Sequence, residues 1–125
     1  MFVLKGILRA ESQEKVLIYL LVRETGYARS IAEFYGVPTN PVQKQLARLE
    51  EDGVVIGSYV GNVRQYKFNP RYAFIEPLKE LLKKAVAAYP SDVQMNLTVQ
   101  RTRPRQPGKP SNRLRESKQA TNDDN

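Results

Sequence analysis

The chain has 125 residues, enough for one domain with a core of modest size. Its 20 lysines and arginines outnumber 13 acidic residues, and the resulting net charge of +7 favours an anionic partner such as nucleic acid or an anionic membrane surface. Cysteine and histidine are absent, which excludes disulfides, thiolate redox chemistry, Cys/His metal sites and histidine bases, so no cofactor is expected.

The apolar segments of the chain are short. The longest, VLIYLLV at 16–22, falls well below the roughly 20 residues that a membrane span needs. The N-terminal stretch MFVLKGILR lacks the long apolar region and small-residue cleavage site of a signal peptide. The sequence therefore predicts a soluble, cytoplasmic protein without a membrane partner, in which residues 1–11 form a short apolar arm.

Two helices are predicted after the arm. Apolar residues recur at helical spacing in SQEKVLIYLLVRE and, over a shorter stretch, in RSIAEFYG. Ser12 and Ser30 have the side chains of N-caps, and Gly26 and Gly36 follow the two patterns, where glycine commonly ends a helix.

A third helix is predicted after the tight turn GVPTNP. Thr39 or Asn40 is a suitable N-cap, and Pro41 fits the first turn because the missing N–H has no partner there in any helix. Asp52 and Gly53 mark its end. Its buried seam is expected to consist of Val42, Leu46 and Leu49.

Beyond Gly53 the apolar period changes to two, which predicts a β-hairpin. VVIGSYV and VRQYKFN flank Gly61-Asn62, a pair suited to a two-residue turn. This loop sets the register, pairing Val55 with Phe68, Gly57 with Tyr66, and Tyr59 with Arg64. Gly57 is expected to leave room for the Tyr66 ring.

A long amphipathic helix is predicted in YAFIEPLKELLKKAVAAY, followed by a tail. The apolar stripe of this helix is either core or, as we expect from its length, a dimer seam shared with the first helix and the arm; it consists of Phe74, Ile75, Leu78, Leu81, Leu82, Ala85 and Val86. Residues 90–125 have little periodicity apart from the segment VQMNLTV. They contain four prolines and 7 basic against 4 acidic residues, so a disordered basic tail is expected.

The predicted order is typical of a winged helix-turn-helix domain over residues 12–89, a mainly α fold (α+β) with a small β-hairpin. Residues 4–88, above all LARLEEDGVV, VGNVRQYKFNP and NPRY, resemble winged-helix transcriptional regulators of the arsenic-repressor type (ArsR-like). They are closer to the winged-helix segments that stand beside nucleotidyltransferase domains. The resemblance implies the fold and DNA binding. Without Cys or His it implies no metal sensor, and no catalytic domain is recognisable after residue 89.

The polar face of the third helix, about 40–52, is the predicted reader of the DNA major groove. Amides pair with adenine, lysine donates to guanine, and a helix N-terminus suits a phosphate. The hairpin, about 58–65, is predicted to form a wing on the DNA backbone or in the minor groove. The expected DNA-binding residues are Thr39, Asn40, Gln43, Lys44, Ala47, Arg48, Ser58, Tyr59, Asn62 and Arg64.

The sequence thus predicts a homodimeric, sequence-specific regulator of transcription that binds double-stranded DNA and is not an enzyme. The acidic run at 50–52 is interpreted as a solvated helix end because adjacent helical carboxylates point in different directions. Two alternatives remain open. One is a nonspecific architectural DNA- or RNA-binding protein that depends on the basic tail, and the other is a non-catalytic adaptor for a separate nucleotidyltransferase. The sequence indicates no effector ligand.

Overall fold

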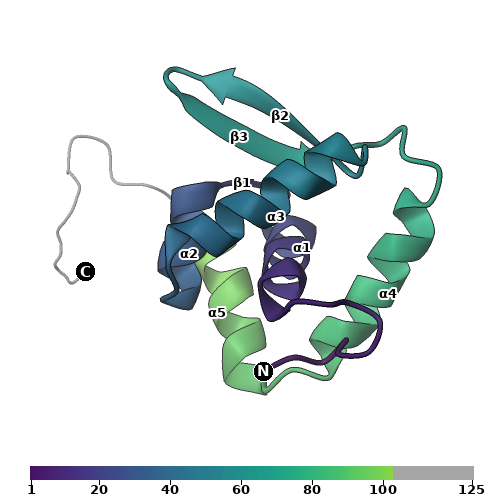
Figure 1. Cartoon of the computed structure of the whole chain (residues 1–125). Helices are drawn as coiled ribbons and strands as arrows, with labels where there is room; N and C mark the ends of the chain where they lie inside the picture. Colours follow the sequence, from purple (N-terminus) through teal and green to yellow (C-terminus); the bar gives the residue numbers. More distant parts are fainter. Residues whose placement is uncertain (103–125) are drawn as a thin grey trace, which may run out of the picture.

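The computed structural model describes residues 1–102, with side chains through residue 98. This part has an α+β fold of five helices and one three-stranded antiparallel sheet, in a winged-helix-like layout (Figure 1). The elements are α1 (Glu11–Arg23), β1 (Thr25–Tyr27), α2 (Ala28–Tyr35), α3 (Thr39–Glu51), β2 (Val55–Val60), β3 (Val63–Phe68), α4 (Ile75–Ala87) and α5 (Ser91–Thr102). Within residues 1–102, no helix is both long and apolar enough to cross a membrane.

The hairpin β2–β3 extends above α3, and its predicted register is confirmed (Figure 1). Val55 lies opposite Phe68, Gly57 opposite Tyr66, and Tyr59 opposite Arg64. A Cβ atom at Gly57 would lie 2.9 Å from the Tyr66 ring and would also collide with the Arg64 guanidinium. Glycine at this position therefore lets two large side chains cross the face of the hairpin that is turned towards α3.

The short strand β1 was not predicted from the sequence. It joins the free edge of β3, where Gly26 lies opposite Tyr66, and gives the strand order β1-β3-β2. A Cβ at Gly26 would lie 2.8 Å from the Tyr19 ring and 3.2 Å from Ile31, so glycine permits the close approach of this strand to α1 and α2. Gly26 thus belongs to the sheet and does not simply end a helix.

The predicted caps of the first two helices are wrong, although the helices are present. Ala10 precedes α1, which makes Ser12 its second residue. Tyr27 precedes α2, and the Ser30 hydroxyl accepts the Tyr27 N–H from inside the first turn. Gly36 ends α2 in the left-handed conformation, as expected (φ 67°).

Helix α3 has nearly the predicted bounds. Thr39 is its first residue and Pro38 occupies the N-cap position, so neither Thr39 nor Asn40 caps the helix. Pro41 lies in the first turn, and Gly53 follows the end of the helix with φ 82°. The expected seam is confirmed, because Val42, Leu46 and Leu49 are all buried.

The N-terminal arm is held against the helices by a buried carboxylate. Glu14 of α1 has no exposed surface, and its carboxylate accepts the backbone N–H groups of Val3 (3.0 Å) and Leu4 (2.6 Å). The Tyr89 hydroxyl, beyond the end of α4, donates to the same carboxylate (2.5 Å). One side chain thereby joins the arm, α1 and the connection between α4 and α5.

The last helices differ from the prediction in two ways. Part of the expected dimer seam is the chain's own core, because Ile75, Leu82 and Ala85 of α4 are buried within the chain. The disorder expected from residue 90 is wrong for 91–102, which form α5 against α1, with Leu97 fully buried. Most of the predicted tail, 103–125, lies outside the described residues.

Candidate nucleic-acid interface

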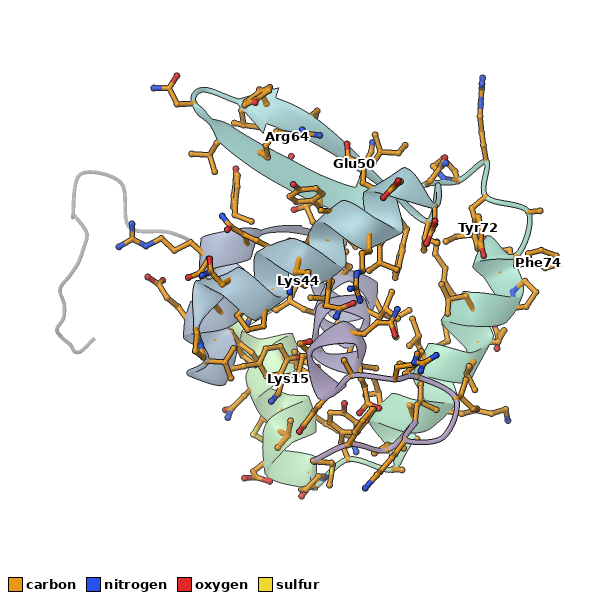
Figure 2. The ribbon with its side chains drawn as sticks, in the orientation of Figure 1. Lys15, Lys44, Glu50, Arg64, Tyr72 and Phe74 are labelled. Atoms are coloured by element: carbon orange, nitrogen blue, oxygen red, sulfur yellow. The ribbon has the colours of Figure 1, made fainter. Side chains whose placement is uncertain are left out.

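The exposed face of α3, on which Lys44 is labelled in Figure 2, brings together most of the predicted DNA-binding residues. This face lies opposite the buried seam, and it presents Asn40, Gln43, Lys44, Ala47 and Arg48, all of them exposed, with half-buried Thr39 at the start of the helix. Ala47 leaves space between its longer neighbours. The result is a helix surface with two amides and two cations available to an external partner.

Charge is distributed unevenly along this surface. In the described part of the chain, Lys44 and Arg48 form no ion pair with an acidic side chain. The C-terminal end of α3 instead carries Glu50 and Glu51, followed by Asp52. Lys44 therefore lies nearer the positive end of the helix dipole, while Arg48 lies in the last turn close to the acidic residues, among which Glu50 is paired with Arg64.

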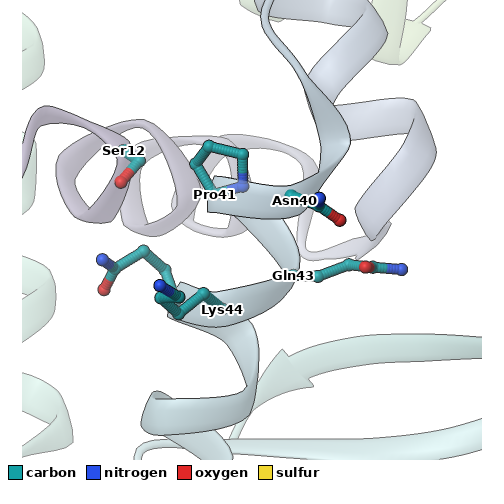
Figure 3. Close-up of a pocket in the computed structure, with 6 residues that line it drawn as sticks. Ser12, Asn40, Pro41, Gln43 and Lys44 are labelled. Atoms are coloured by element: carbon teal, nitrogen blue, oxygen red, sulfur yellow. The ribbon is translucent and has the colours of Figure 1, made fainter.

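An open hollow lies beside the first turn of α3 (Figure 3). It is lined by Ser12, Asn40, Pro41, Gln43, Lys44 and Gln45. Asn40 and Gln43 extend to one side of α3, and Ser12 comes from the first turn of α1 (Figure 3). Sequence reasoning missed Ser12 as a site residue, because only the packing of the two helices brings it beside α3.

The hairpin contributes three of the four residues expected from it. Asn62 is exposed in the turn, and Tyr59 is 70 % exposed. Tyr59 and Arg64 are opposite each other on the face turned towards α3, whereas Ser58 pairs with Gln65 and lies on the other face. The structure does not group Ser58 with the other predicted residues, because neighbouring strand residues point to opposite faces.

Arg64, which the sequence predicts to lie on the DNA backbone or in the minor groove, is paired with a carboxylate in the structure. Its Nη2 donates to Oε2 of Glu50 (2.5 Å), and its guanidinium lies over the rings of Tyr59 (5.2 Å) and Tyr66 (5.6 Å). The hydrogen bond to Glu50 raises the pKa of the Arg64 guanidinium above its usual value. The interpretation of the acidic run at 50–52 as a solvated helix end agrees with the exposure of Glu51 and Asp52, whereas Glu50 is partly buried and ties α3 to the hairpin.

Residues 1–102 contain no cluster of three or more acidic side chains arranged to hold a metal ion. A second hollow lies between α1, α2 and α5, lined by Tyr19, Arg23, Ser30, Glu33, Phe34, Tyr35, Val93 and Asn96.

No known family, curated protein or solved structure shows significant similarity to the chain.

Proposed function

We propose that this chain is a winged helix-turn-helix protein that binds double-stranded DNA sequence-specifically and regulates transcription without catalysing a reaction. The observation that carries the proposal is the division of α3 between a buried apolar seam and an exposed face with two amides and two cations, neither of which forms an ion pair within residues 1–102. An α-helix, about 10–12 Å across, fits a major groove about 12 Å wide.

In this proposal the N-terminal half of α3 reads base edges. Asn40 and Gln43 can pair bidentately with adenine, and Lys44 can donate to guanine. The hydroxyls of Ser12 and Thr39 are suited to phosphate oxygens beside the positive end of the helix. The hairpin, with Asn62 in its turn, lies on the DNA backbone or in the minor groove.

The first expected result concerns Gln43→Ala and Lys44→Ala. Each should weaken binding to a duplex selected from a random pool by about 1 to 3 kcal/mol, because each removes a base contact, and should relax the preference at one position per half-site. Binding to random duplex should change little for Gln43→Ala. Affinities for both duplexes at several salt concentrations measure the loss, with a substitution at an exposed lysine of α4, Lys84→Ala, as the charge-matched control for Lys44→Ala.

A chain truncated after residue 102 distinguishes this proposal from the alternative of a nonspecific architectural DNA- or RNA-binding protein. The basic composition of the chain favours that alternative. Residues 103–125 contain six basic and three acidic residues, so they can neutralise phosphates without reading sequence. Removing them should weaken binding to selected and random duplexes by similar factors. If this truncation abolishes the preference for the selected duplex while the α3 substitutions leave it intact, α3 is not the reader and the architectural function replaces the proposed one.

We further propose that the protein acts as a homodimer through the outer side of α4 and the arm. In support, Phe74 at the start of α4 and Ile7 of the arm are 64 % and 66 % exposed, and α4 stands at one edge of the domain (Figures 1 and 2). Two recognition helices would then lie about 34 Å apart and read half-sites roughly 10 bp apart.

The dimer is expected to have twice the 14.3 kDa mass of the chain at micromolar concentration. Phe74→Glu should shift this mass to that of the monomer, because it introduces a charge into the apolar surface. Met95→Glu, at a comparably exposed apolar residue of α5, should leave the mass unchanged. Light scattering with size-exclusion chromatography checks both variants, and a monomeric unmodified chain would contradict the dimer.

A further inference from the structure

An arginine side chain whose hydrogen-bond donors are only partly paired lies between the hairpin and the C-terminal end of α3. Arg64 reaches from β3 across Gly57 to Glu50 in the last turn of α3 (Figure 2). The side chains of Arg64 and Glu50 remain 35 % and 34 % exposed. The pair therefore lies at the surface, beside the face of α3 proposed to meet DNA.

The hydrogen bonding of this arginine is incomplete. Glu50 accepts from Nη2, while the buried Nε–H has no partner in the described part of the chain. The rings of Tyr59 and Tyr66 hold the guanidinium plane from the hairpin side. A guanidinium can offer parallel N–H groups to one phosphate, which would fill more of its hydrogen-bonding capacity than this single contact with Glu50.

We propose that Arg64 exchanges partners when the protein binds DNA, leaving the Glu50 carboxylate for a phosphate of the duplex backbone. This inference rests on the proposed DNA-binding function and adds a role for Glu50, which competes with phosphate and so weakens binding to every duplex. Tyr59 and Tyr66 are positioning residues, because they hold the guanidinium while its partner changes.

The test compares Glu50→Gln with Glu51→Gln. Both remove one negative charge from the end of α3, but Glu51 is exposed and has no ion pair among the described residues. Glu50→Gln should bind a random-sequence duplex about two- to fivefold more tightly than Glu51→Gln does, because Arg64 no longer has to leave a carboxylate. The gain should disappear when Arg64→Gln is added to both variants.

Salt dependence tests the exchange by a second route. Arg64→Gln alone should flatten the plot of log affinity against log salt by about 0.9, the value for one lost phosphate contact. An unchanged slope means that Arg64 remains on Glu50 in the complex and overturns the exchange. So does a Glu50→Gln affinity equal to or weaker than that of Glu51→Gln. If the unmodified chain binds no duplex, the proposed function itself fails, and the exchange fails with it.

Discussion

Replacing Glu14 with alanine is expected to lower the free energy of unfolding by about 3 to 5 kcal/mol. The substitution leaves three donors without their acceptor, namely the backbone N–H groups of Val3 and Leu4 and the Tyr89 hydroxyl. Each buried donor that loses its partner costs about 1 to 3 kcal/mol, and partial relaxation reduces the sum. Chemical denaturation followed by circular dichroism measures the loss.

Two further variants show whether the carboxylate is the cause. Tyr89→Phe removes one of the three donors, so it should cost about 1.5 to 3 kcal/mol, the usual range for a hydrogen bond to a charged group. Glu80→Ala, at a largely exposed carboxylate of α4, should change stability by no more than about 0.5 kcal/mol. A Glu14→Ala chain as stable as Glu80→Ala would mean that the arm is not held through Glu14.

Replacing Leu97 with alanine is expected to cost about 2 to 5 kcal/mol, the range for a fully buried leucine. Leu97 has no exposed surface, and its carbonyl accepts a hydrogen bond from Nε of Arg23 in α1 (3.3 Å). Met95, on the same helix, is 61 % exposed, so Met95→Ala is the matched control and should stay within about 0.5 kcal/mol. The same denaturation measurement compares the two.

Truncation places the boundary of the folded domain independently. A chain ending at residue 102 keeps α5 and should unfold at the temperature of the full chain, whereas one ending at residue 88 loses both Tyr89 and Leu97 and should be strongly destabilised. Equal melting temperatures for the two truncated chains would mean that the folded domain ends near residue 89, as the sequence predicts. The result also determines which truncation can be used to test DNA binding by the tail.

Much of the fold follows from local pattern. The bounds of α3 and its buried seam follow from apolar residues at helical spacing, and Pro41 and Gly53 stand where a helix begins and ends. The hairpin register follows from a two-residue loop between segments of period two, since this loop leaves one pairing in which apolar residues share a face. The same patterns identify the exposed face of α3, because a helix with one buried seam must expose the opposite side.

Other features were decided by the tertiary structure. Strand β1 has three residues and forms because β3 offers a free edge, and Ser12 joins the hollow at α3 because α1 packs there. Arg64 and Glu50 are 14 residues apart, and Glu14 and Tyr89 are 75 apart. Sequence periodicity fixes which face of an element is apolar, but the partner of a polar side chain is set by how the elements pack. The sequence alone therefore determined which face of α3 is exposed, while packing decided that Arg64, beside that face, is already bound to a carboxylate.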